Sequence, residues 1–199
     1  MVALLAGGLQ WRRDAHGLAG VGSGSHGVKT LEIRRHSLRN PATQDLSPEG
    51  IALARLIGME MGRFDRVLTS PLPRAIQTAQ AMGFKVDETV ELLASTGDAV
   101  EAECPWPASF VEYAAAYGRG RATFELARSL AQFYTAVVQS LPEHGAALIV
   151  THGGIVELSA VGCLPSADFS ALGDYVESCE GVRLTWQEGQ FTNLQVLRV

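Results

Sequence analysis

Short apolar runs alternate with longer segments of helical periodicity along most of this chain. Runs of aliphatic and β-branched residues that stop at turn-forming residues are typical of buried strands. Such runs lie at residues 30–35, 64–69 and 146–151, and a further strand could lie within 84–93. Apolar residues that recur three or four positions apart predict helices at residues 48–62, 74–82, 123–141 and 153–162.

The order of these elements predicts the fold class. Strands that alternate with helices form a mainly parallel sheet with helices on both faces, which is a three-layer α/β sandwich. Two strands at residues 182–187 and 191–197 flank a Glu-Gly turn and predict an antiparallel hairpin at the carboxyl-terminal edge of the sheet. Residues 94–120 show only a weak pattern, with a short helix expected at 109–117.

The amino-terminal region differs in composition from the rest of the chain. Glycines interrupt any periodicity there, and residues 23–27 have the composition of a linker. We therefore expect residues 1–28 to form a flexible appendage and residues 29–199 to form a single domain. His16 and His26 fall in the appendage and are not candidates for a site.

Composition excludes several classes of function. With 47% hydrophobic and 19% charged residues the chain is typical of globular proteins, and its net charge of −5 argues against nucleic-acid binding. No apolar run reaches the ~18–20 residues that a membrane span needs. Cys104, Cys163 and Cys179 are widely spaced, which indicates reduced thiols rather than disulfides or a zinc site. We expect a cytoplasmic protein, and the sequence leaves its oligomeric state open.

Three predicted strands end in residues that suit phosphate chemistry. The first ends at Arg35 and His36, the second leads to Arg74 one helical turn later, and the third ends at His152 before Gly153. Because the carboxyl ends of parallel strands share one edge of a sheet, these residues should meet there. Arginine offers a fixed fork of donors for a phosphoryl group, and glycines let backbone N–H groups at a helix start approach an anion.

The two histidines indicate the kind of reaction. A neutral imidazole is a competent nucleophile, and flanking arginines disfavour its protonated form. A second imidazole, if protonated, can stabilise charge on the transferring oxygens. Each of these residues taken alone could be structural, but structural explanations for all of them together are much less favoured. The sequence has no clustered carboxylates suited to Mg²⁺ or a two-metal site, so we expect neither a metal nor another cofactor.

The same residues carry a family resemblance. From about Leu31 to Leu197 the chain resembles the histidine phosphatase superfamily, which has the phosphoglycerate mutase-like fold. The resemblance implies that His36 becomes phosphohistidine and that Arg35, Arg74 and His152 form a phosphate pocket without a metal. The matching motifs, in the family's order, are Arg35-His36, Leu46-Ser47-Pro48-Glu49-Gly50, Thr69 to Ala79, and Val150-Thr151-His152-Gly153-Gly154.

The chain departs from the family pattern around both histidines. Ser37 follows the nucleophile, where glycine is usual. Asn40, beside Arg39, comes slightly earlier than the usual pocket asparagine, and both are candidate substrate-binding residues together with Gly153. Glu157 stands where a basic residue often follows the second histidine.

The acid that most family members carry soon after the second motif is missing from its usual context. We take Glu101 as the candidate general acid, because the weakly patterned segment around it could fold over the edge of the sheet as a lid. Glu101 could equally be a solvated loop charge, and Glu91, Asp98 and Glu103 are the other candidates. Compact family members without this acid can act on substrates with better leaving groups, such as phosphohistidine on a protein.

These observations favour a metal-independent phosphatase that hydrolyses phosphate esters or phosphohistidine through phospho-His36. Its partner would be a small phosphorylated substrate or a phosphoprotein, and neither a nucleic acid nor a membrane. An alternative is a phospho-ligand-binding or regulatory protein of the same fold without turnover, which Ser37 and the missing acid motivate. A phosphoglycerate mutase-type phosphotransferase is the least favoured, because the chain is short of the extra segments that resemble a true mutase.

Overall fold

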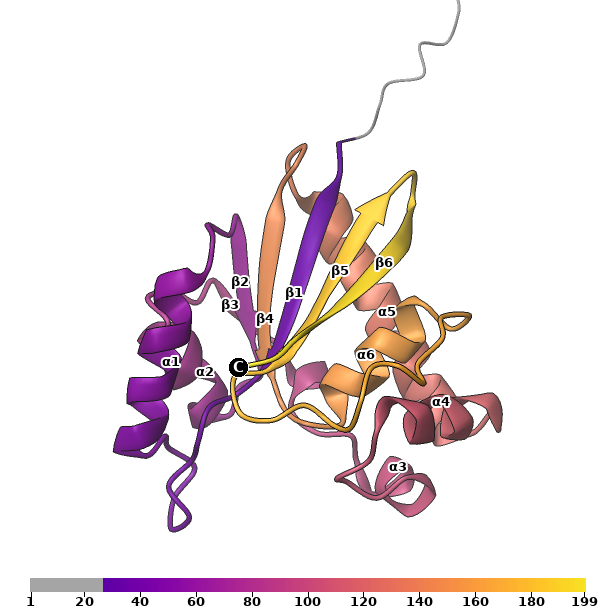
Figure 1. The fold of residues 1–199 in the computed structure, drawn as a ribbon, viewed down its shortest axis with the longest axis horizontal. Helices are drawn as coiled ribbons and strands as arrows, with labels where there is room; N and C mark the ends of the chain where they lie inside the picture. Colours follow the sequence, from indigo (N-terminus) through magenta and orange to yellow (C-terminus); the bar gives the residue numbers. More distant parts are fainter. Residues whose placement is uncertain (1–26) are drawn as a thin grey trace, which may run out of the picture.

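A mixed β-sheet forms the centre of the molecule, and helices cover both of its faces (Figure 1). The computed structural model describes residues 27–199, and the strands of this part are ordered β3-β2-β4-β1-β5-β6. The predicted α/β sandwich is therefore confirmed, whereas the predicted appendage lies almost entirely outside the described residues. In chain order the elements are β1 (Lys29–Arg35), α1 (Pro48–Glu60), β2 (Arg66–Thr69), α2 (Pro73–Ala81), β3 (Glu88–Thr89), the 3-10 helix η1 (Glu91–Leu93), α3 (Asp98–Glu103), α4 (Phe110–Gly118), α5 (Ala122–Ser140), β4 (Ala146–Thr151), α6 (Ile155–Cys163), β5 (Gly181–Gln187) and β6 (Gln190–Leu197).

Parallel pairing places β1 and β4 side by side at the centre of the sheet. Arg35 is the register partner of Thr151 at their carboxyl ends, and β2 pairs in parallel with the other side of β4. β5 runs antiparallel to β1, and β6 runs antiparallel to β5, so the predicted hairpin forms and occupies one edge. The carboxyl ends of β1, β2 and β4 consequently meet at one end of the sheet, at the bottom of Figure 1.

The central strand β4 shows how the two faces are covered. Ala147 and Ile149 belong to the main hydrophobic cluster, to which α5 and α6 contribute. Leu148 and Val150 belong to a second cluster, to which α2 contributes Ala75. Because alternate residues of a strand face opposite sides of the sheet, a strand covered on both sides is apolar at every position. This is why residues 146–151 show a continuous apolar run.

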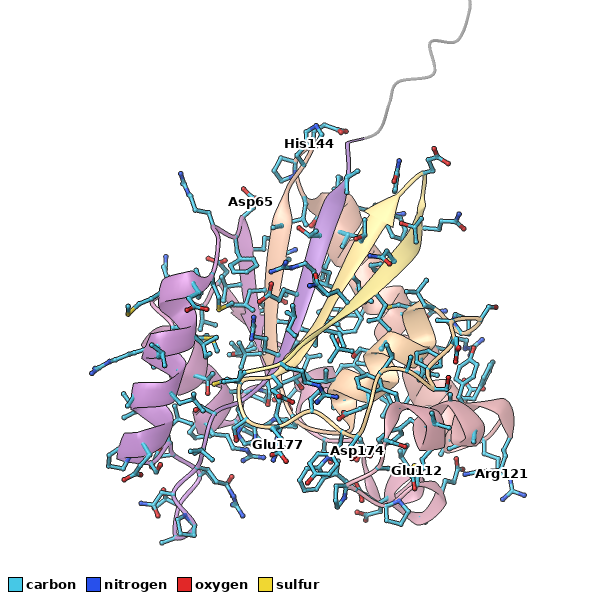
Figure 2. The ribbon with its side chains drawn as sticks, in the orientation of Figure 1. Asp65, Glu112, Arg121, His144, Asp174 and Glu177 are labelled. Carbon is cyan, nitrogen blue, oxygen red and sulfur yellow. The ribbon has the colours of Figure 1, made fainter. Side chains whose placement is uncertain are left out.

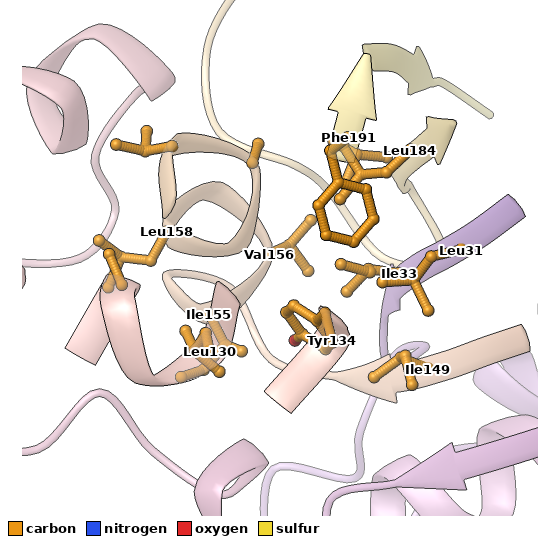
Figure 3. Packing of buried hydrophobic residues seen from close by; sticks show 14 of the residues in the cluster. Leu31, Ile33, Leu130, Tyr134, Ile149, Ile155, Val156, Leu158, Leu184 and Phe191 are labelled. Carbon is orange, nitrogen blue, oxygen red and sulfur yellow. The ribbon is translucent and has the colours of Figure 1, made fainter. Parts of the chain in front are cut away.

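The main cluster joins the sheet to α5 and α6 (Figure 3). Leu31 and Ile33 from β1 lie with Tyr134 from α5, Val156 from α6 and Leu184 from β5, and all five side chains are fully buried. A large apolar side chain contributes about 1.5–3 kcal/mol when it is buried. The packing that stabilises the domain therefore also holds the start of α6 close to the carboxyl end of β4.

Helix α1 begins as the sequence predicts. The Ser47 hydroxyl accepts a hydrogen bond from the Gly50 N–H at 3.1 Å, Pro48 is the first helical residue, and Glu49 lies in the first turn. A cap of this kind contributes about 1 kcal/mol to helix stability. The buried Ala54 then packs with Met82 at the end of α2, so that α1 is held against α2.

The weakly patterned region contains more regular structure than predicted, and the strand expected within residues 84–93 contains only Glu88 and Thr89. In place of a loop followed by one helix, residues 94–120 hold both α3 and α4. Val100 of α3 and Phe110 of α4 are buried in the main cluster. Short helices are marginal in isolation, so this region depends on tertiary packing that a local pattern does not contain.

Gly162 marks the closest approach of α6 to α5. A Cβ atom at this position would lie 2.3 Å from the Ala127 carbonyl oxygen, so any side chain forces the helices apart. We predict that Gly162→Ala lowers the free energy of unfolding by about 1–3 kcal/mol, although alanine has the higher helix propensity. Gly118→Ala, at a position in α4 with nothing within 4 Å of an added Cβ, is the control. Urea denaturation measures both, and equal midpoints would contradict the tight contact.

Candidate active site

A cavity of about 470 Å³ opens where β1, β2 and β4 end. It collects the four residues on which the predicted phosphate chemistry rests: Arg35 and His36 at the end of β1, Arg74 in the first turn of α2, and His152 directly after β4. The parallel sheet therefore brings together residues that are far apart in the sequence. The complete lining consists of Arg35, His36, Ser37, Leu38, Arg39, Gln44, Arg74, Trp106, His152, Gly153 and Ser178.

A second hollow, of about 520 Å³, lies beside β6 and the segment after α6. Asp168 is the only charged residue in its lining, and neither arginine nor histidine contributes to it. The cavity at the strand ends is smaller, but it contains the cations and imidazoles that an anionic ligand requires. It is therefore the candidate active site.

His36 is held with one ring nitrogen bound to the backbone and the other facing Arg74. Its Nδ1 lies 2.7 Å from the Ser37 carbonyl oxygen, which can only accept, so Nδ1 carries the proton. Nε2 then keeps its lone pair, and the Arg74 Nε–H donates to it at 3.0 Å. The ring is almost fully buried. This geometry makes Nε2 the atom of His36 that can act as a nucleophile.

The family departure at Ser37 is accommodated by the structure. Ser37 is fully buried, and its hydroxyl donates to the Gly50 carbonyl oxygen at 2.7 Å, at the start of α1. Its backbone N–H donates to the Thr78 hydroxyl at 2.9 Å. The Ser37 hydroxyl is thus directed to α1, and the carbonyl that orients His36 is one that a glycine would also provide.

His152 lies beside His36, with a ring-centroid distance of 5.1 Å and an interplanar angle of 60°. Its Nε2 is 2.7 Å from the Ser70 hydroxyl oxygen, which also accepts the Leu72 N–H at 3.2 Å. Its Nδ1 is buried and has no hydrogen-bond partner in the part of the chain that the structure describes. Because buried polar atoms are nearly always paired, Nδ1 is a group that a bound oxyanion could satisfy.

Burial lowers the pKa of both imidazoles. The pKa of His36 falls from 6.5 to about 4, chiefly because burial removes water from the charged form. The hydrogen bond to Ser37 opposes this shift, and the charges of the neighbouring arginines add to it. The pKa of His152 falls to about 3, first through burial and then through the nearby His36 and two arginines. Both rings are therefore neutral near pH 7, and a protonated His152 would require an anion nearby.

The two arginines of the cavity are held differently. Arg35 donates to the Val176 carbonyl oxygen at 2.9 Å, and its guanidinium lies 4.8 Å from the centre of the Trp106 ring. Its Nε is buried without a hydrogen-bond partner among residues 27–199. A terminal nitrogen of the same guanidinium lies 3.8 Å from the exposed carboxylate of Glu177. Figure 2 shows Glu177 on the loop between α6 and β5, near the strand ends. The Arg74 guanidinium instead donates to the side-chain oxygen of Gln44.

Arg39 and Gly153 also line the cavity, whereas Asn40, the third predicted substrate-binding residue, does not. Asn40 lies in the turn after Arg39, and its side-chain oxygen accepts the Ala42 N–H at 2.9 Å. Gly154 begins the α6 helix, but its N–H donates to the Glu157 carboxylate at 2.7 Å instead of remaining free for an anion. At least one backbone N–H group at the start of α6 is therefore bound to a side chain and is not free to bind an anion.

The acid candidates lie outside the cavity lining, which contains no carboxylate among the residues that the structure describes. Glu101 accepts hydrogen bonds from the Thr96 hydroxyl at 2.7 Å and from the Trp106 N–H at 3.1 Å. Glu103 binds two backbone N–H groups at the start of α5. Glu91 and Asp98 are exposed. The role of Glu101 as a general acid stays a prediction.

Leu38, Gln44, Trp106 and Ser178 also line the cavity and were not predicted from the sequence. Gln44 lies among turn residues and has no pattern that distinguishes it from its neighbours. Trp106 stands between Pro105 and Pro107 in the weakly patterned region, and a tryptophan between two prolines was the one available signal. Ser178 lies on the loop before β5, whose path is decided by tertiary contacts.

Two features are absent from residues 27–199. No helix in this part of the chain combines the length and the apolar character that a membrane crossing requires. No group of three or more His, Cys, Asp and Glu side chains in it is placed to hold a metal ion.

We predict that His36 and His152 stay neutral in the ligand-free protein from pH 8 down to about pH 5, because their pKa values are about 4 and about 3. In the unfolded chain these two histidines bind protons below about pH 6.5. Their contribution to folding stability should therefore fall as the pH is lowered from about 6.5 to about 4. Side-chain ¹⁵N NMR measures the ring protonation. Titration of either ring near pH 6.5 would contradict the burial that lowers both values.

Comparison with known proteins agrees with this fold. The family model of the histidine phosphatase superfamily (branch 1) matches residues 26–197. A phosphoserine phosphatase from Entamoeba histolytica, in complex with 3-phosphoglyceric acid, superposes with a TM-score of 0.63 at 17% identity, over 86% of this chain and 98% of that chain. A phosphoglycerate mutase from Bacillus anthracis str. Sterne gives a TM-score of 0.61 at 18% identity, over 88% and 94%. No curated protein sequence matches the chain. The solved structures share the fold, and because the family match spans most of the sequence, this protein belongs to the histidine phosphatase superfamily.

Proposed function

We propose that this protein is a metal-independent phosphatase that hydrolyses phosphate esters or phosphohistidine through a phosphohistidine on His36. The observation that carries the proposal is the state of His36. Its Nδ1–H is fixed on the Ser37 carbonyl, and its neutral Nε2 lies in a cavity with Arg35, Arg74 and His152. A neutral, oriented imidazole in a cationic cavity suits nucleophilic attack on a phosphoryl group.

The first step transfers the phosphoryl group to the protein. The dianionic phosphoryl group of the substrate enters the cavity, and the Arg74 guanidinium exchanges its contact with His36 for the phosphoryl oxygens. The freed Nε2 lone pair forms a bond to phosphorus, and the bond to the leaving group breaks with its electron pair. Arg35 stabilises the charge on the transferring oxygens, and so does His152 through its unpaired Nδ1 once the anion raises its pKa.

The second step releases inorganic phosphate. A water molecule attacks phosphorus from the side opposite to His36, the Nε2–phosphorus bond breaks, and the electron pair returns to Nε2. The proton lost by the water passes to bulk solvent or to phosphate. His36 is then neutral again, so the two steps together hydrolyse the substrate with no net change in the protein.

The electrostatics of the cavity support an anionic substrate. Arg35, Arg39 and Arg74 all belong to the lining, to which the described residues contribute no carboxylate. Arg39 is exposed at the cavity and has no ion pair within the described part of the chain. The exposed Leu38 and Trp106 add apolar surface for the leaving group. We propose that phosphate occupies the histidine side and that Arg39, Leu38 and Trp106 contact the leaving group.

A phospho-ligand-binding protein without turnover is the second candidate, and one contact favours it. The Arg74 Nε–H occupies the lone pair of His36 Nε2 at 3.0 Å, so the resting nucleophile is engaged. If a bound phosphate did not displace this contact, the cavity would hold the anion without reacting. The two candidates differ in turnover and in the covalent intermediate.

We predict that His36→Ala abolishes hydrolysis of an aryl phosphate while the fold is retained, because the variant lacks the imidazole that attacks phosphorus. Wild-type protein quenched during turnover should carry phosphate that is labile to acid and stable to base, and the variant should carry none. Near-wild-type turnover by His36→Ala would exclude the covalent mechanism. Phosphate binding by the wild type without turnover or trapped phosphate would instead establish the second candidate.

We predict that Glu101→Gln slows alkyl phosphate hydrolysis by ~10²–10⁴-fold and spares an aryl phosphate, because only the alkyl leaving group needs a proton. For this role the Glu101 carboxylate must exchange its contact with the Trp106 N–H for the leaving group. Steady-state rates on the two substrates provide the measurement. Equal losses on both would indicate that Glu101 only positions Trp106. If neither rate changes, the site works without this acid, and phosphohistidine becomes the first substrate to test.

A further inference from the structure

Glu157 is a buried carboxylate that links two walls of the cavity without lining it. It lies in the first turn of α6 and is fully buried. One carboxylate oxygen accepts the Gly154 N–H at 2.7 Å, and the other accepts the Val176 N–H at 2.8 Å. The two donors belong to different segments, one directly after β4 and one on the loop between α6 and β5. The carboxylate therefore joins these segments to each other.

The first contact controls the turn that follows His152. Gly154 has a φ of +83°, a conformation that side chains rarely adopt, and its N–H points back to the Glu157 carboxylate. The His152 carbonyl oxygen meanwhile accepts the Val156 N–H at 3.2 Å in the same turn. Because the backbone on the carboxyl side of His152 is held by these bonds, the Glu157 contact helps to fix where the imidazole lies.

The second contact controls the anchor of Arg35. The Val176 N–H is bound by Glu157, and the carbonyl of the same residue accepts the Arg35 guanidinium at 2.9 Å. Val176 itself is fully buried, and Ser178 on the same loop lines the cavity. A shift of Val176 would therefore move the guanidinium that faces the bound anion. Glu157 thus reaches Arg35 through one residue.

A carboxylate is the group that these two contacts require. Each donor binds a separate oxygen, and an amide side chain has only one oxygen, so it would turn an NH₂ group towards an N–H donor. Burial raises the pKa of Glu157, while the backbone N–H groups and the charge of Arg35 oppose that rise. An exposed residue can supply the helix cap alone, as Glu112 does for α4 by accepting the Ser109 N–H at 2.7 Å. The buried Glu157 makes the same kind of helix cap and, in addition, accepts the Val176 N–H.

We propose that Glu157 is a positioning residue that holds Arg35 and the turn after His152 in the arrangement that binds a phosphoryl anion. The inference rests on the proposed function only in taking this cavity as the phosphate site. It gives a role to a residue that departs from the family pattern.

The test compares Glu157→Gln with Glu112→Gln, a matched control that loses the same kind of helix cap on α4. Inorganic phosphate is the probe, measured by calorimetry and as a competitive inhibitor of aryl phosphate hydrolysis. Glu157→Gln should weaken phosphate binding by about tenfold or more and raise KM, because a charge-assisted contact of Arg35 is misplaced. Glu112→Gln should lower Tm without changing phosphate affinity.

A double-variant cycle separates positioning from general stability. In an Arg35→Ala background, Glu157→Gln should weaken phosphate binding less than it does in the wild type, since the guanidinium is gone and only the turn after His152 is left to position. Glu157→Asp keeps the charge but is one methylene too short to reach both donors, so it should also weaken binding. If Glu157→Gln does not fold, the phosphate affinity of Glu157→Asp tests the positioning role instead.

Three results distinguish the outcomes. Wild-type phosphate affinity in Glu157→Gln or Glu157→Asp, with only a lower Tm, would overturn the positioning role and leave the proposed function intact. Full additivity of the Glu157 and Arg35 variants would overturn it too. Failure of the wild-type protein to bind phosphate at all would instead contradict the proposed function.

Discussion

The parallel pairing of β1 and β2 with β4 is the constraint on which the site depends. Beyond the end of β1, the His36 N–H still donates to the Thr151 carbonyl at 2.8 Å, and on the other side the Ser70 N–H donates to the Val150 carbonyl at 2.9 Å. Both neighbours of β4 therefore leave the sheet at the same level as His152. The registry of backbone hydrogen bonds brings the two imidazoles within 5.1 Å and places Ser70 against one of them. A register shift on either side would separate these groups.

Arg34 and Arg35 are neighbours on β1, but only the charge of Arg35 faces the cavity. Arg34 faces the opposite side of the sheet, where it donates to the buried Glu32 at 2.6 Å and to the Cys179 carbonyl. Arg35 has a backbone anchor and an aromatic neighbour, but its closest carboxylate is the exposed Glu177 at 3.8 Å. A separation of this size across solvent contributes little. The charge of Arg35 therefore remains available to a bound anion.

Burial, together with this unbalanced charge, explains why the resting histidines are neutral. The fall in the pKa of His36 from 6.5 to about 4 corresponds to about 3 kcal/mol against protonation, and burial is its largest cause. A phosphate dianion would bring the opposite charge to the same place and would favour protonation of His152. The described lining has no carboxylate to repel such an anion, and the anion could draw the Arg74 guanidinium away from His36. Glu157, outside the cavity lining, accepts the Val176 N–H, and the Val176 carbonyl oxygen accepts the Arg35 guanidinium.

The sequence alone determined the fold class and the four central residues of the site. Periodicity and turn residues are local signals, and parallel strands necessarily bring their carboxyl ends together, so Arg35, His36, Arg74 and His152 could be placed at one edge. Tertiary structure decided which loop residues complete the cavity, because the paths of these loops depend on contacts between distant segments. Gln44 lines the cavity whereas Asn40 does not, and Glu101 is bound to Thr96 and Trp106 outside it. The link from Glu157 through Val176 to Arg35 joins three separate segments. No local pattern encodes it, since each hydrogen bond in it depends on how the folded chain packs.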